Sequence, residues 1–137
     1  MIYRSIKKCI TSQSKKYNND QHRLISKNTI GKIGEWCTVI RYLCMMYIIV
    51  GRRVRNKEGE IDLIFQRFNS IVFVEVKTSR SRVMYSYLRI KVDQQQRIKK
   101  AARLFLQTNK QYRGCKPRFD ASFVSYMFIP KIVKHAF

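Results

Sequence analysis

The first clear pattern along the chain is helical. From near Asn28, apolar residues recur every three or four positions, which predicts a helix that ends near Met45 or Met46. The residues that we expect on its buried face are Ile33, Trp36, Ile40 and Leu43. Residues 1–27 are polar and basic, and they predict a loosely ordered arm that either contacts phosphates or is a passive tail.

β-branched and aromatic residues dominate the next part of the chain. They predict strands over residues 47–55, 60–66 and 71–78. The short segment 67–70 separates the second strand from the third, which indicates a hairpin. The third strand opens with an almost continuous apolar run, which is typical of a strand buried on both faces.

The last third of the chain predicts one more helix and one more strand. Helical spacing predicts a helix over residues 93–107, and alternation predicts a strand over residues 119–129. The apolar face of this second helix comprises Ile98, Ala101, Ala102, Phe105 and Leu106. The order helix, strand, strand, strand, helix, strand predicts a single α/β domain over residues 28–137.

Composition indicates in which cellular compartment we expect this domain. No apolar run approaches the roughly 20 residues that span a bilayer, and the basic N-terminus lacks the apolar stretch of a secretory signal. The four cysteines lack the spacing of a zinc knuckle, so we expect reduced thiols. We therefore expect a cytoplasmic protein without a membrane partner.

Charge points to a partner. The chain has 29 Lys and Arg against 8 Asp and Glu, a formal net charge of +21. Such a chain repels itself unless it meets a polyanion, and binding to phosphates releases counterions. We expect a nucleic acid partner, although charge alone also fits a ribosome-associated basic protein.

The few acids are concentrated where strands are predicted. Four of the eight, Glu58, Glu60, Asp62 and Glu75, lie between residues 58 and 75, although acids are disfavoured in strands. A symmetric hairpin pairs positions whose numbers sum to 137. That register places Asp62 opposite Glu75 and Glu60 opposite Lys77.

Opposed carboxylates repel each other unless a cation lies between them. Hard oxygen ligands select Mg²⁺ or Mn²⁺, and Lys77 would project beside that metal, where a phosphate or an attacking water would lie. A structural salt bridge of Lys77 with Glu75 or with Glu60 is the alternative explanation of the same residues.

A longer set of motifs resembles a known family. The spacing from Asp62 to Glu75-Val76-Lys77 is similar to the PD-(D/E)XK nuclease signature. The wider match covers about residues 31–137 and resembles the YraN-like family of predicted bacterial endonucleases. It consists of Gly34-Glu35, Gly59-Glu60-Ile61-Asp62-Leu63-Ile64, Val72-Phe73-Val74-Glu75-Val76-Lys77, Gln95-Gln96-Arg97-Ile98, Ala101-Ala102-Arg103-Leu104, Arg118-Phe119-Asp120 and Ala136-Phe137.

The resemblance implies a fold and a set of roles. It implies a restriction-endonuclease-like α/β core, similar to that of Holliday-junction resolvases, with a mixed sheet flanked by helices. Asp62 and Glu75 would be the main metal ligands, Val76 would lend its backbone carbonyl, and Glu35 would be an acid borne on a helix. Lys77 would be the catalytic lysine, and we keep Glu60 as an accessory acid.

The chain departs from the family pattern at two places. Met46-Tyr47 stands where Gly-Tyr is usual before the first strand. Gln94 stands where many members carry a lysine near the start of the second helix, so one substrate contact of those members is missing from the expected site.

The basic residues around these acids predict phosphate contacts rather than base reading. They are Arg52, Arg53, Arg55, Lys57, Arg80, Arg82, Arg89, Lys91, Lys99, Lys100 and Arg103. Tyr85 and Tyr87 could stack on unpaired bases. The sequence thus favours a Mg²⁺- or Mn²⁺-dependent nuclease acting on DNA rather than RNA. A non-catalytic nucleic-acid-binding module is the alternative, and a homodimer using Phe123, Tyr126 and Phe128 is left open.

Overall fold

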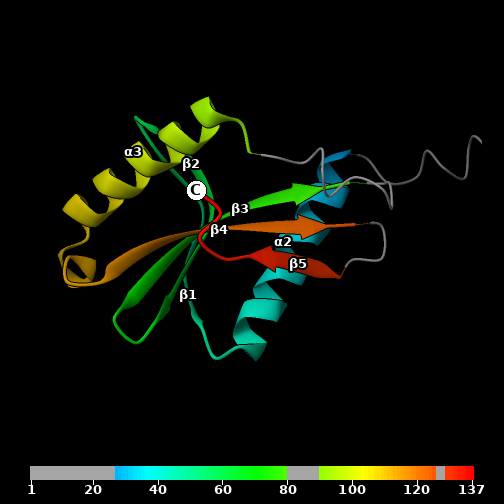
Figure 1. Cartoon of the computed structure of the whole chain (residues 1–137), viewed down its shortest axis with the longest axis horizontal. Helices are drawn as coiled ribbons and strands as arrows, with labels where there is room; N and C mark the ends of the chain where they lie inside the picture. Colours follow the sequence, from blue (N-terminus) through cyan, green and yellow to red (C-terminus); the bar gives the residue numbers. More distant parts are fainter. Residues whose placement is uncertain (1–26, 80–89, 126–128) are drawn as a thin grey trace, which may run out of the picture. The chain divides into compact units, whose positions relative to one another are not determined.

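The fold is known from a computed structural model that describes residues 27–79, 90–125 and 129–137. Figure 1 shows the elements in chain order along this part of the chain. They are α2 (Lys27–Cys44), β1 (Ile48–Asn56), β2 (Gly59–Arg67), β3 (Ser70–Thr78), α3 (Val92–Thr108), the 3₁₀ turn η1 (Lys110–Tyr112), β4 (Lys116–Val124) and β5 (Pro130–Val133). The predicted arm lies outside the described residues except for its last residue.

The strands form one five-stranded sheet in the order β1-β2-β3-β4-β5. β3 and β4 run parallel, while the other neighbouring strands run antiparallel. The connection between the two parallel strands contains α3, the usual way of joining parallel neighbours. The expected α/β fold with a mixed sheet is therefore confirmed, and it is consistent with a restriction-endonuclease-like core.

The two helices pack on two separate apolar clusters of the sheet. Val39 and Tyr42 of α2 pack with Leu63, Phe65, Val72 and Val74. Ile98, Ala101 and Ala102 of α3 pack with Ile61, Ile64, Ile71 and Phe73. β3 contributes to both clusters, and its residues 71–74 are fully buried. The prediction of a strand covered on both faces is confirmed. In the described residues, no helix is long and apolar enough to cross a membrane.

The predicted buried face of α2 is wrong for three of its four residues. Trp36, Ile40 and Leu43 are 52%, 59% and 46% exposed, whereas Val39 and Tyr42 are buried. The helix turns a neighbouring stripe toward the sheet because polar residues on that stripe find partners there. The hydroxyls of Thr38 and Ser122 are 2.7 Å apart, and the Tyr42 hydroxyl donates to Asp120 at 2.8 Å. Apolar spacing alone does not reveal those partners.

The end of the sheet also differs from the prediction. One strand was expected over residues 119–129, but β4 begins at Lys116 and ends at Val124, and a separate antiparallel strand, β5, begins at Pro130. Proline cannot donate to a ladder and occurs in edge strands or at the first residue of a strand; Pro130 is the first residue of β5, which lies at the edge of the sheet. Phe123 is half-buried on β4, and the other two aromatic residues considered for a dimer face lie outside the described residues.

Candidate active site

The site is built where β2 separates from β3. Their ladder follows the predicted register, in which paired numbers sum to 137, from Arg67–Ser70 to Leu63–Val74. The next expected pair, Asp62 with Glu75, does not form. Instead, the backbone N–H of Val76 donates to the Asp62 carboxylate at 2.8 Å. β3 stays paired with β4 up to Thr78, so the two halves of the sheet open beside Asp62.

Burial and nearby charge perturb Asp62. Burial raises the pKa of its carboxyl most, and the negative charges of Glu75 and Glu35 raise it further. The Val76 N–H and the Lys77 ammonium lower it, and the resulting pKa is about 7. Asp62 thus lies within the electrostatic reach of both other acids, and a cation placed among them would favour its ionised form.

Glu75 and Lys77 extend from β3 toward α3. Glu75 is 6% exposed, and Lys77 Nζ lies 2.8 Å from its Oε1. The salt bridge considered as an alternative from the sequence is therefore present. A third residue joins the pair: Gln94, in the first turns of α3, donates from Nε2 to the same Oε1 and accepts a hydrogen bond from Lys77 Nζ at 3.0 Å.

Gln94 was not among the predicted site residues. Its sequence signal was its position near the start of the second helix, where the resemblance expects a lysine. The structure shows that the residue at this position reaches the acid and the lysine of β3. The long amide side chain retains a contact with the site without adding a charge.

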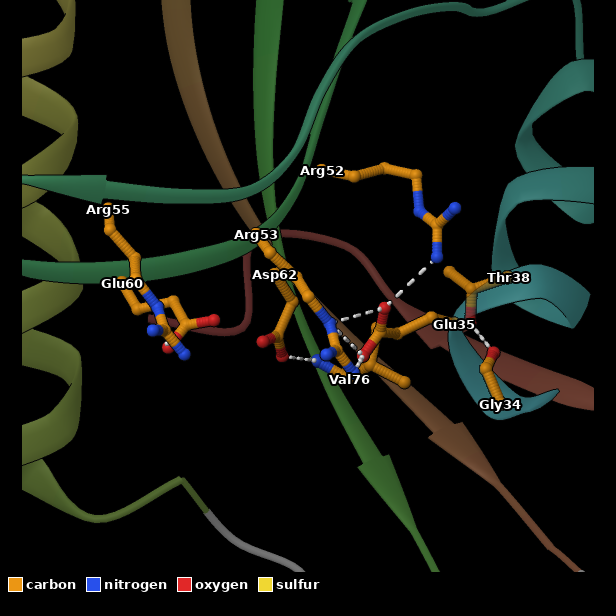
Figure 2. Close-up of polar contacts among 9 residues, drawn as sticks. All are labelled: Gly34, Glu35, Thr38, Arg52, Arg53, Arg55, Glu60, Asp62 and Val76. Carbon is orange, nitrogen blue, oxygen red and sulfur yellow. Dashed lines mark hydrogen bonds and ion pairs between the residues drawn. The ribbon is translucent and has the colours of Figure 1, made fainter. Parts of the chain in front are cut away.

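Glu35 comes to the site because α2 approaches the sheet closely at Gly34. A Cβ built on Gly34 would lie 2.2 Å from Thr78 Cγ2, so a larger residue does not fit without movement. The next residue, Glu35, is buried and accepts hydrogen bonds from Arg53 at 2.7 and 3.1 Å and from Arg52 at 3.4 Å. Figure 2 shows this group beside Asp62.

The backbone of β1 helps to form this contact. Arg53 has a φ of 48°, in the left-handed region that is uncommon for residues other than glycine. The Arg53 side chain contacts Glu35 from this position, and the Arg52 guanidinium also lies 4.1 Å over the Trp36 ring. These two arginines were predicted to contact phosphates, and here they neutralise the acid of α2.

Glu60 lies apart from Lys77. Its Oε2 is 3.0 Å from Arg55 Nε, a cross-strand partner on β1. The predicted pairing of Glu60 with Lys77 is therefore wrong, because β2 has already left β3 at that level. In Figure 2 the Arg55–Glu60 pair lies on the α3 side of Asp62, and Glu35 lies on the α2 side.

The remaining basic residues of the predicted set are dispersed. Lys57, Lys100 and Arg103 line a cavity of about 290 Å³ between the β1–β2 turn and α3, together with Glu58, Leu104 and Gln107. Lys99 Nζ lies about 6 Å from the rings of Phe119 and Phe137, and Lys91 stands directly before α3. Arg80, Arg82, Arg89, Tyr85 and Tyr87 lie outside the described residues.

The carboxylates of the site could hold a magnesium ion with only a few protein ligands. Among the described residues, no three His, Cys, Asp or Glu side chains are grouped closely enough to hold a metal ion together. Mg²⁺ needs fewer, because it keeps several waters and is held through one or two carboxylates. Asp62 and Glu75 supply two carboxylates whose mutual repulsion a cation would relieve. Glu35, held by two arginines, would act through a water.

The comparisons with known proteins agree on one family. A model described as "Uncharacterised protein family UPF0102" matches residues 34–124. The chain is 35% identical to a UPF0102 protein of Ehrlichia ruminantium over 109 residues, which is 80% of this chain and 83% of that protein. It is 37% identical to one of Mesorhizobium japonicum over 107 residues, 78% of this chain and 85% of that protein.

A third relative, from Caldicellulosiruptor saccharolyticus, is 39% identical over 97 residues, 70% of this chain and 81% of its own length. The family match covers α2 from Gly34 onward, including Glu35, and it also covers the β2–β3 hairpin and Gln94. It also confirms the resemblance drawn from the motifs. The chain therefore belongs to the UPF0102, or YraN, family.

Proposed function

We propose that this protein is a metal-dependent nuclease that hydrolyses phosphodiester bonds in DNA. The observation that carries the proposal is the placing of two carboxylates, Asp62 and Glu75, at the opening between β2 and β3. Their repulsion contributes to raising the pKa of Asp62 to about 7, and Lys77 lies directly beside one of them. Such perturbed acids with a specific charged neighbour are typical of functional sites.

The proposed roles follow from chemistry and position. Asp62, Glu75 and the backbone carbonyl of Val76 would hold Mg²⁺ or Mn²⁺, which when bound supplies a Lewis acid and an activated water. Lys77 would donate hydrogen bonds to the phosphate oxygens that gain negative charge. Glu35 would orient a water, and its ion pairs with Arg52 and Arg53 would hold its side chain in place.

DNA is the proposed partner because of the net charge of +21 and the three basic residues that line the cavity beside α3. Contacts to phosphates position a nucleic acid without reading its sequence. The cavity lined by Lys57, Lys100 and Arg103 is the described surface best suited to them. The proposed substrates are branched or single-stranded DNA.

A second candidate is a nucleic-acid-binding module without catalysis. It is favoured by the pairing of the acids: Glu35 with Arg52 and Arg53, Glu60 with Arg55, and Glu75 with Lys77. If these ion pairs are purely structural, the acids only stabilise the domain. Of the three acids on β2 and β3, Asp62 is the one without an ion pair in the described residues, so it distinguishes the two candidates.

The test compares cleavage and binding in Asp62→Asn. A nuclease should lose Mg²⁺-dependent cleavage in this variant while its affinity for DNA is kept or increased, because a negative charge near the phosphates is gone. Asp93→Asn, which removes an exposed acid in the first turn of α3, is the matched control and should cleave like the wild type. Full cleavage by purified Asp62→Asn would exclude the proposed site.

A further inference from the structure

We infer that Gln94 is a positioning residue that fixes Lys77 and Glu75 relative to each other within the proposed site. The inference rests on the proposed function for its catalytic meaning. The contacts themselves are features of the fold. The inference gives a role to Gln94, which stands where the family pattern led us to expect a lysine.

Three contacts join the three side chains in a closed ring. Gln94 Nε2 donates to Glu75 Oε1, Lys77 Nζ donates to Gln94 Oε1 at 3.0 Å, and Lys77 Nζ lies 2.8 Å from Glu75 Oε1. The amide thus uses its donor on the acid and its acceptor on the lysine. A side chain with only one of these functions could not contact both groups in this way.

The ring determines which oxygen of Glu75 is engaged. Both Gln94 and Lys77 contact Oε1, so Oε2 is the oxygen that takes part in neither contact. Glu75 would therefore have Oε2 available for a cation that it would hold together with Asp62, while Lys77 stays at Oε1. Gln94 would therefore separate the two tasks of Glu75, binding a cation and holding the lysine.

The elements that carry the three residues make this arrangement rigid. Glu75 and Lys77 point to the same side of β3 because strand side chains alternate. Gln94 belongs to α3, whose Ile98 and Ala101 are buried on the sheet. The next residue, Gln95, donates to the Ile90 carbonyl at 2.9 Å and so attaches the start of the helix to the preceding chain. Lys77 is therefore held by an anchored helix as well as by its own strand.

The neutrality of Gln94 also matters. A cationic side chain at this position would compete with a divalent cation for Glu75 and would repel Lys77. The amide fixes both groups while leaving the negative charge of Asp62 and Glu75 available for a metal. A charge at this position should change metal affinity in a predictable direction.

The first test measures the reactivity of Lys77 in the metal-free protein, using amine acetylation followed by mass spectrometry. In Gln94→Ala we expect Lys77 to be acetylated several-fold faster, because one of its two partners is gone. Gln94→Glu keeps an acceptor for Lys77 and should label as slowly as the wild type. Gln96→Ala, from the exposed side of the same glutamine run, is the matched control and should leave Lys77 unchanged.

The second test measures Mn²⁺ affinity and cleavage in the same variants, together with Gln94→Lys. We expect Gln94→Lys to weaken Mn²⁺ binding because it adds a positive charge beside Glu75. We expect Gln94→Ala to lower kcat roughly tenfold, the effect of losing one hydrogen bond to a charged group, with KM for DNA little changed.

The outcomes separate the two proposals. Lys77 reactivity in Gln94→Ala equal to that in Gln96→Ala would overturn the role of Gln94, whatever the enzyme does. Increased Lys77 reactivity with unchanged kcat in an active enzyme would also overturn it, because the contact would then have no positioning effect. A wild-type protein that never cleaves would instead overturn the nuclease, while the acetylation result would still decide whether Gln94 holds Lys77.

Discussion

At the scale of single residues, Asp62 carries the most information. It belongs to a strand whose neighbours are apolar, it lies near two other acids, and its carboxylate accepts the N–H of Val76 that would otherwise face the opening between β2 and β3. An ionised carboxyl at a buried position destabilises the fold unless a partner compensates its charge. The strand gives up part of its ladder to place a carboxylate at the opening.

The effect of a buried Asp62 carboxyl on the free energy of unfolding should be measurable in the metal-free protein. The folded-state pKa of Asp62, about 7, lies above its ordinary value of 3.8, so between these values the folded protein keeps a proton that the unfolded chain releases. The stability from protonated Asp62 is therefore present below about pH 4 and is lost as the pH rises toward 7. Above pH 7, an ionised Asp62 destabilises the fold.

We therefore predict that Asp62→Asn raises the free energy of unfolding of the metal-free protein at pH 8. The gain should be on the order of 1 to 4 kcal/mol, since each pKa unit corresponds to about 1.4 kcal/mol. Urea unfolding with EDTA at pH 8 and at pH 4 measures it, and the difference between variant and wild type should nearly vanish at pH 4. A variant less stable than the wild type at pH 8 would mean that Asp62 is a structural residue.

At the scale of elements, two contacts organise the site: α2 against the end of β3, and α3 against β2 and β3. The first depends on Gly34, which leaves no room for a side chain against Thr78. The second depends on the small residues Ala101 and Ala102, which let α3 lie close to the sheet. Each helix presents one polar residue, Glu35 or Gln94, to the opening.

The close approach of α2 predicts opposite effects for two glycines on the same helix. Gly34→Ala should destabilise the fold by about 1–3 kcal/mol, because the added methyl overlaps Thr78, whose branched side chain is stiff. Gly31→Ala meets nothing within 4 Å and should stabilise the helix by about 0.5–1 kcal/mol. Thermal unfolding of both variants measures this, and equal effects would contradict the described packing of α2.

The sequence predicted the elements better than their faces. The register of the β2–β3 hairpin followed from symmetry about residues 68 and 69, and burial of β3 followed from its apolar run. The face of α2 could not be predicted, because Thr38 and Tyr42 are polar by type and are buried only through Ser122 and Asp120. The contact of Gln94 could not be predicted either, because it depends on where α3 crosses the sheet. The same holds for the left-handed backbone of Arg53.

At the scale of the whole molecule, excess positive charge and a small group of acids act together. A net charge of +21 would attract a polyanion to the protein. The acids at the β2–β3 opening would then repel that polyanion locally unless a cation joined them. Binding of DNA and binding of metal should therefore favour each other, a coupling that a purely structural acid cluster would not show.

The cavity at α3 gives a prediction for the binding of DNA. Removing Lys100 and Arg103 together should weaken binding to duplex DNA irrespective of sequence. It should also reduce the slope of log affinity against log salt by about 1.8, because each phosphate contact contributes about 0.9. Lys110→Ala with Lys116→Ala removes the same charge from exposed positions outside the cavity and is the control. Equal losses of slope in both double variants would show that only net charge matters.

The central claim is that the acids at the β2–β3 opening form a metal-dependent catalytic site. The most direct measurement is cleavage of labelled single-stranded, duplex, flap and four-way-junction DNA by the purified protein in Mg²⁺, Mn²⁺ or EDTA, beside Glu75→Ala. We predict cutting of at least one DNA in Mg²⁺ or Mn²⁺, none in EDTA, and none by Glu75→Ala. Tight binding of all four DNAs without cutting, or cutting that survives in Glu75→Ala, would contradict the account.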